Sequence, residues 1–203
     1  MLDVYALRLL HPATSAAAKR LDAMGLKADQ ATLAGFAAGL AAFALIAFGW
    51  PLTAIIPMLF SRTLDGLDGA LARLQGTTDR GAFLDINLDF CFYAAIPLAF
   101  ALAEPEANGL AAAVLLAAFL GTGTSFLAYA AIAEKRGLKS TAYPSKSIYY
   151  LGGLTEGTET IACFLAMCCW PQHFAIIAYV YAGLCALTTL MRIFAGWRSF
   201  AED

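Results

Sequence analysis

Residues 30–61 read QATLAGFAAGLAAFALIAFGWPLTAIIPMLFS and contain no charged side chain. A single helix of that length would rise about 48 Å at roughly 1.5 Å per residue, well beyond a hydrocarbon core of about 30 Å. The stretch therefore predicts two membrane passes, with a turn at Gly49-Trp50-Pro51 because proline lacks the amide hydrogen that a continuing helix needs. Residues 160–191 repeat this pattern, uncharged apart from His173, and residues 107–133 form one long pass.

The composition of the 203-residue chain agrees with a membrane protein, since 61% of its residues are hydrophobic and 14% are charged. These values exclude a disordered chain, a collagen and a secreted disulfide scaffold. The amino terminus lacks the pattern of a signal peptide, so we expect the spans themselves to direct insertion. We predict an all-α integral membrane protein in one domain, residues 1–203: an amphipathic interfacial helix at residues 2–24 precedes a six-helix bundle at about 31–194. The six predicted transmembrane helices are residues 31–49, 51–72, 82–103, 108–133, 148–169 and 172–194.

The basic residues predict the orientation, because Lys and Arg are retained on the cytoplasmic side of a membrane. All thirteen fall before the first pass, within or beside the even-numbered connections, or near the end of the chain. The odd-numbered turns, predicted at Pro51, Pro105 and Pro171, contain none. Both termini and the even-numbered connections are therefore expected in the cytoplasm.

Two acidic pairs flank the second connection, in residues 65–73 (DGLDGALAR) and 81–89 (GAFLDINLD). Asp65 and Asp68 are three residues apart, and Asp85 and Asp89 are four apart, so each pair occupies one helix face. The two helices run in opposite directions from a shared loop, which places both pairs at a similar depth. Four carboxylates can therefore converge.

Carboxylates inside a membrane protein need compensation, since one Asp near a helix centre costs roughly 2.5 to 3.5 kcal/mol. Clusters of oxygen ligands suit hard cations such as Mg²⁺ or Mn²⁺, and Mg²⁺ commonly joins carboxylates to substrate phosphates. Gly69 leaves room for a bulky group to approach the backbone, and Arg73 suits a phosphate. The pattern predicts a metal-bridged pyrophosphate site.

These residues resemble the CDP-alcohol phosphotransferase family, whose signature is D-x-x-D-G-x-x-A-R, a short gap, then G-x-x-x-D-x-x-x-D. Every fixed position of the signature is present, at Asp65, Asp68, Gly69, Ala72, Arg73, Gly81, Asp85 and Asp89. Asp29 and Thr32, at the start of the first pass, are similar to the family's Asn/Asp-x-x-Thr element. The resemblance covers the chain as architecture and is specific as sequence over about residues 62–90.

The resemblance implies transfer of a phosphoalcohol group from a CDP-linked lipid donor to an acceptor hydroxyl, with release of CMP. In that family the first three aspartates hold Mg²⁺ or Mn²⁺, and the fourth both contacts the metal and acts as general base; here these are Asp65, Asp68 and Asp85, then Asp89. The substrate-binding residues carried over from the family are Asp29, Thr32, Gly69, Ala72, Arg73, Thr78 and Gly81. CDP-diacylglycerol is the expected donor, because the compact six-pass plan resembles bacterial members. The expected location is the bacterial inner membrane, as a homodimer, with no nucleic-acid partner.

Several alternatives stay open on the sequence alone. The donor could be a CDP-amino-alcohol and the acceptor diacylglycerol, as in choline and ethanolamine phosphotransferases. A divalent-cation or proton-coupled transporter would explain the acids, but it would not explain the glycines and arginine at fixed offsets. A catalytically idle scaffold is disfavoured because no catalytic position is replaced. Arg62 could bind an acceptor phosphate or pair with a nearby Asp, and Glu156 and Glu159 could form an acidic pocket wall.

Overall fold

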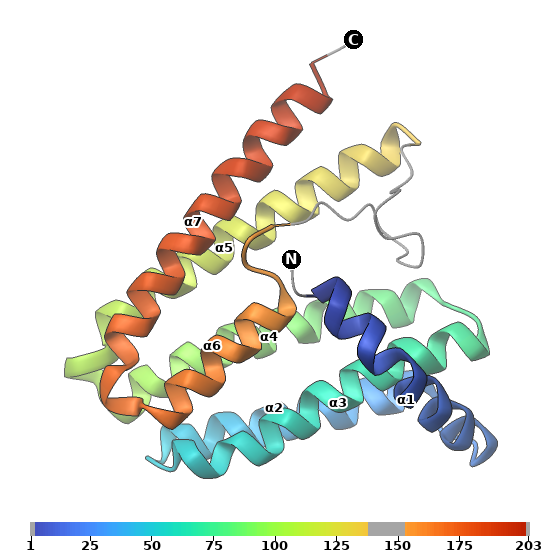
Figure 1. The fold of residues 1–203 in the computed structure, drawn as a ribbon, viewed down its shortest axis with the longest axis horizontal. Helices are drawn as coiled ribbons and strands as arrows, with labels where there is room; N and C mark the ends of the chain where they lie inside the picture. Colours follow the sequence, from blue (N-terminus) through green and yellow to red (C-terminus); the bar gives the residue numbers. More distant parts are fainter. Residues whose placement is uncertain (1–2, 138–152, 202–203) are drawn as a thin grey trace.

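The computed structural model describes residues 3–137 and 153–201, and within these residues every regular element is helical (Figure 1). The order is α1 (Asp3–Ala23), α2 (Ala28–Ala47), α3 (Pro51–Gln75), α4 (Asp79–Ala103), α5 (Pro105–Lys135), α6 (Gly157–Cys169), the short 3₁₀ helix η1 (Pro171–His173) and α7 (Phe174–Ser199). Proline is the first residue of α3, α5 and η1. The three predicted proline turns are thereby confirmed.

The helices form two groups. In one group α2 packs against α3 and α4, and in the other α5 packs against α7. Helix α4 also contacts α5, and α6 contacts α3 and α7, so these helices join the groups (Figure 1). Helix α1 lies against α3, where Ala18 is buried together with Ala31, Ala70 and Leu71. The amino-terminal helix thus packs onto the end of α3 that carries the acidic motif.

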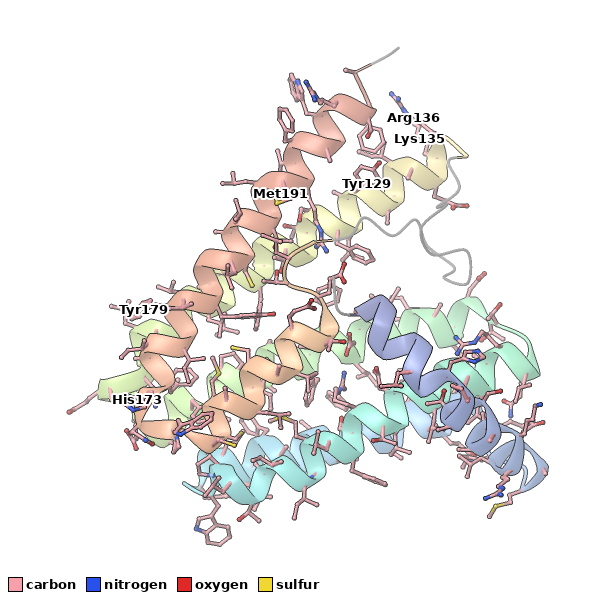
Figure 2. All side chains as sticks on the ribbon, in the orientation of Figure 1. Tyr129, Lys135, Arg136, His173, Tyr179 and Met191 are labelled. Carbon is pink, nitrogen blue, oxygen red and sulfur yellow. The ribbon has the colours of Figure 1, made fainter. Side chains whose placement is uncertain are left out.

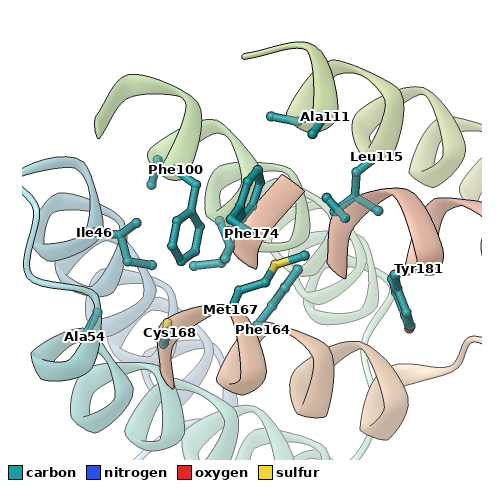
Figure 3. Close-up of a cluster of buried hydrophobic side chains, with 14 of the residues drawn as sticks. Ile46, Ala54, Phe100, Ala111, Leu115, Phe164, Met167, Cys168, Phe174 and Tyr181 are labelled. Atoms are coloured by element: carbon teal, nitrogen blue, oxygen red, sulfur yellow. The ribbon is translucent and has the colours of Figure 1, made fainter. Parts of the chain in front are cut away.

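The hydrophobic core fills the end of the bundle where the short proline turns lie. It combines the carboxyl ends of α2, α4 and α6 with the amino ends of α3, α5 and α7 (Figure 3). Phe100 stacks on Phe174 with ring centroids 4.6 Å apart, and Phe164 lies edge-on to Phe92. Because this end is tightly packed, the helices can separate at the other end without losing the core.

The carboxyl ends of α5 and α7 are joined at the opposite end of the molecule (Figure 2). Tyr129 donates a hydrogen bond to Ser199 at 3.3 Å, and the Arg136 guanidinium donates to the Phe200 carbonyl at 3.2 Å. Lys135 and Arg136 lie at this end of α5, whereas His173 and Tyr179 lie toward the proline turns. Helices α5 and α7 are therefore held together at both ends.

Gly35 and Gly39 allow α2 to approach its neighbours closely. A Cβ atom at Gly35 would lie 3.2 Å from the Leu64 Cβ, and one at Gly39 would lie 2.7 Å from the Phe92 ring. The glycine pair therefore serves helix packing within one chain. The homodimer stays a prediction.

The predicted spans agree with α2, α3, α4, α5 and α7 to within about five residues at each end. The fifth span is the exception. Its predicted start at residue 148 lies outside the described residues, and residues 153–156 are not helical, so α6 begins only at Gly157. In this segment the Gly153 amide donates to the Glu156 carboxylate at 3.0 Å and Thr155 donates to Thr188 at 3.0 Å. These side-chain bonds take the place of a helical turn.

Four of the described helices are long and apolar enough to cross a membrane: α2, α4, α5, and η1 with α7. Helix α3 has 25 residues but carries the charged motif, and α6 has 13 residues, about 20 Å at 1.5 Å per residue. Four of the six predicted crossings therefore coincide with helices that are able to span a membrane, and the count of six stays a prediction. The interfacial placement of α1 stays a prediction as well.

Candidate active site

A cavity of about 1240 Å³ opens between the two helix groups, and its lining comes from α2 to α7 and their connections. All eleven predicted site residues line it: Asp29, Thr32, Asp65, Asp68, Gly69, Ala72, Arg73, Thr78, Gly81, Asp85 and Asp89. The sequence places these residues up to 60 positions apart, so their presence around one cavity is a property of the fold.

The four predicted metal ligands also surround a much smaller void. Asp65, Asp68, Asp85 and Asp89 bound a space of about 10 Å³ together with Thr32 and Arg62. That volume is close to the space needed for one water molecule. The antiparallel α3 and α4 therefore place both acidic pairs around the same small void.

Asp68 lies deepest in this cluster, with 4% of its surface exposed. One of its carboxylate oxygens, Oδ2, is buried without a hydrogen-bond partner among the described residues. A buried carboxylate oxygen is costly to leave unpaired, and a divalent cation would satisfy it. The all-oxygen donor set suits Mg²⁺ or Mn²⁺. As placed, however, no three acidic, His or Cys side chains of the described residues lie close enough together to hold a metal, so the ligand set stays a prediction.

Arg62 lies among the aspartates. Its Nη1 is 2.5 Å from Asp89 Oδ1 and 3.5 Å from Asp65 Oδ1, and its Nη2 donates to Ser61 Oγ at 3.2 Å. The guanidinium carbon lies 3.9 Å from the centre of the Phe92 ring, within the range of a cation–π contact. Of the two roles left open by the sequence, this geometry supports pairing with aspartate.

The mouth of the cavity is formed by the starts of α2 and α4. Thr78 caps α4 by accepting a hydrogen bond from the Gly81 amide at 3.1 Å, and Asp29 pairs with the exposed Arg80. A Cβ atom at Gly81 would lie 3.1 Å from Thr78 Oγ1 and 3.2 Å from Asp29 Oδ1. Glycine at this position therefore keeps both polar side chains in place.

Helix α3 contributes the other side of the mouth. A Cβ atom at Gly69 would lie 3.5 Å from the Arg73 guanidinium, so this guanidinium extends over the bare backbone of the helix. Gln75 fixes the end of α3 to the connection between α1 and α2: it donates to Asp22 and Leu26 and accepts from the Ala28 amide. These bonds hold the beginning of α2 beside the motif.

The wall opposite the aspartates contains two buried charged residues, Glu156 and Arg192, of which the sequence indicated only Glu156 as a pocket residue. Arg192 is 7% exposed, and its Nη1 donates to the Thr122 carbonyl of α5 at 3.0 Å. Glu156 is 5% exposed and accepts from the Gly153 amide. From the sequence, Arg192 was interpreted only as one of the basic residues that predict orientation. Its position within an apolar run, between Met191 and Ile193, was the signal that could have identified it as a buried residue of the cavity wall.

The fold and the cavity together define an all-helical membrane protein with a buried acidic site at one end of its bundle. Residues 26–191 match the family model described as CDP-alcohol phosphatidyltransferase. The chain belongs to this family, and it is an enzyme that transfers a phosphate-containing group. The resemblance seen in the sequence is thereby confirmed.

Among curated proteins, the chain is similar to "Inner membrane protein YnjF" of Escherichia coli K12, with 49% identity over 97% of this chain and 96% of that protein. Among solved structures, it is similar in fold to the phosphatidylinositol phosphate synthase PgsA1 of Mycobacterium tuberculosis. The form with CDP-DAG bound gives a TM-score of 0.74 at 24% identity, over 94% of this chain and 96% of that one. The form in complex with manganese and citrate gives 0.73 at 24% identity, over 94% and 92%.

Proposed function

We propose that this protein transfers a phosphatidyl group from CDP-diacylglycerol to the hydroxyl of an acceptor alcohol and releases CMP. The observation that carries the proposal is the single cavity around which all eleven predicted site residues lie. The cavity is also lined by apolar side chains of α4 and α5, such as Phe90, Leu116 and Phe119, which suit a lipid-linked donor. The CDP-DAG bound to the similar PgsA1 fold supports the same donor class.

Asp65, Asp68, Asp85 and Asp89 would hold Mg²⁺ or Mn²⁺. When bound, the metal would neutralise the diphosphate of the donor and the leaving CMP. The unpaired buried oxygen of Asp68 supports this assignment, as does the manganese complex of PgsA1. The donor's phosphates and nucleotide would contact the residues of the mouth, Asp29, Thr32, Gly69, Ala72, Arg73, Thr78 and Gly81.

Asp89 would act as general base. It accepts the proton of the acceptor hydroxyl while the acceptor oxygen attacks the phosphorus that carries the diacylglycerol group. The bond from this phosphorus to the oxygen of CMP breaks, and CMP leaves with the electron pair. The apolar lining of the cavity would keep water from competing as acceptor.

We further propose that α3 and α6 complete six crossings, that both termini and the cavity face the cytoplasm, and that the protein is an inner-membrane homodimer. The connections support this arrangement: the three proline turns contain no Lys or Arg, whereas the cavity end is rich in both. The name of the Escherichia coli relative agrees with an inner membrane location.

The direct test is to incubate the purified protein with CDP-diacylglycerol and a panel of alcohols, and to follow CMP release with lipid mass spectrometry. Parallel reactions with CDP-choline or CDP-ethanolamine and diacylglycerol test the other donor class. Asp85→Asn is expected to remove turnover, whereas its matched control Asp79→Asn, an exposed residue outside the cavity lining, is expected to retain it. Absence of CMP release from every donor, with divalent-cation flux into proteoliposomes instead, would favour a transporter.

A further inference from the structure

We propose that Arg62 is a built-in counter-ion of the aspartate cluster: it positions Asp89 and competes with the divalent cation for the same carboxylates, and so sets the metal affinity of the site. This inference rests on the proposed function, because it takes the aspartates as metal ligands. Arg62 itself lies outside the D-x-x-D-G-x-x-A-R pattern, three residues before its first aspartate.

The first step of the argument is the position of the guanidinium. Arg62 bounds the same small void as the four aspartates, and its Nη1 lies within 4 Å of oxygens from both acidic pairs, Asp65 on α3 and Asp89 on α4. A divalent cation held by these aspartates would need oxygens of the same two residues. Two cations would then share one set of carboxylates, and each weakens the binding of the other by charge repulsion.

The second step is that Arg62 has little freedom to leave. Its guanidinium lies on the Phe92 ring, and Phe92 is itself 1% exposed and packed edge-on to Tyr93 and Phe164. Nη2 donates to the fully buried Ser61. The Arg62 side chain is only 14% exposed, so water screens its charge less than it screens a charge on the surface.

The third step separates this role from recognition of an acceptor anion. An arginine that binds a phosphate usually presents two parallel N–H groups to it. Here Nη1 is directed at aspartates and Nη2 at Ser61, while Nε is buried with no partner among the described residues. Nη1, one side of the fork that would grip a phosphate, is therefore already engaged by aspartate. Its chemistry is directed at the aspartates.

The test measures Mn²⁺ binding to the purified protein by electron paramagnetic resonance, without substrates. Arg62→Gln removes the charge and keeps a shorter polar side chain, so Mn²⁺ is expected to bind at least about tenfold more tightly. The rise in melting temperature caused by Mn²⁺ is also expected to grow. Arg62→Lys keeps a charge but loses the planar fork, so an intermediate affinity is expected. The matched control is Arg80→Gln, which removes an 85% exposed arginine from the pair with Asp29 and is expected to change Mn²⁺ affinity by less than about threefold, since exposed charges are screened.

Equal or weaker Mn²⁺ binding by Arg62→Gln would overturn the inference. If that variant does not fold, Arg62→Lys decides: binding no tighter than that of the wild type rejects the proposal. Absence of Mn²⁺ binding in the wild type and in every variant would overturn the metal site of the proposed function, and this inference with it. Mn²⁺ binding that is indifferent to Arg62 overturns the inference alone.

Discussion

Replacing Asp89 by Asn tests whether this residue is chiefly a base or chiefly a metal ligand. Asn keeps the size of the side chain and an oxygen that can still accept from Arg62 Nη1, now at 2.5 Å from Asp89 Oδ1, but it cannot take a proton from an alcohol. The loss of a general base lowers turnover by about 10²-fold or more, which corresponds to roughly 2.7 kcal/mol of activation free energy.

The cost to folding is expected to be smaller. The Arg62–Asp89 pair loses one of its two charges but keeps its hydrogen bond, and the Asp89 side chain is 33% exposed, so part of the ionic attraction is already screened. We expect a loss of about 1 kcal/mol in the free energy of unfolding, which lowers the melting temperature by a few degrees. Turnover must therefore be measured at a temperature where the variant is folded.

The assay compares three variants: Asp89→Asn, Asp65→Asn and Asp68→Asn. CMP release gives turnover, and calorimetry in Mg²⁺ gives the affinity for the CDP-linked donor. Asp89→Asn is expected to lose turnover and largely keep donor affinity, whereas the other two are expected to lose both, because they would organise the contact between metal and diphosphate. Near-normal turnover in Asp89→Asn would refute the base assignment. Equal loss of donor affinity in all three would identify Asp89 as chiefly a ligand.

Three further outcomes are expected. Excess EDTA should abolish CMP release and Mg²⁺ or Mn²⁺ should restore it; full activity in EDTA would contradict the metal site. Ala107 and Thr77 are both exposed and lie at opposite ends of the bundle. In a background with the native cysteines replaced, Ala107→Cys should react with an impermeant thiol reagent from outside the cell, and Thr77→Cys should react only after permeabilisation. The reverse labelling would invert the orientation. Gly39→Ala should lower the melting temperature, because its Cβ would lie 2.7 Å from the tightly packed Phe92 ring and overpacking costs about 1–3 kcal/mol. The control Gly183→Ala, whose Cβ would have nothing within 4 Å, should be neutral or stabilising. Equal effects of the two changes on the melting temperature would show that the contact between Gly39 and Phe92 does not constrain packing.

The chain's local patterns predicted much of the fold. Long uncharged runs predicted apolar helices, and Pro51, Pro105 and Pro171 predicted where new helices start, because both signals act within a few residues of the chain. The predicted start of the fifth span was wrong, since the segment before Gly157 is not helical. It is held by bonds from the Gly153 amide to the Glu156 carboxylate and from Thr155 to Thr188, a residue of α7. Such a contact between distant segments has no local signature.

The site shows the same difference between what local sequence patterns determine and what contacts between distant segments determine. The regular spacing of Asp65, Asp68, Asp85 and Asp89 determined which faces of two helices are acidic, since the helical period depends only on sequence distance. Only the tertiary structure decided that Arg62 lies between the two pairs and that Arg192, more than 100 residues further on, closes the opposite wall of the same cavity. The spacing of residues in the sequence determines which side chains are neighbours within one or two turns of a helix. The position of a guanidinium relative to another helix depends instead on how the helices pack, and contacts such as that of the Phe92 ring with Gly39 determine this packing.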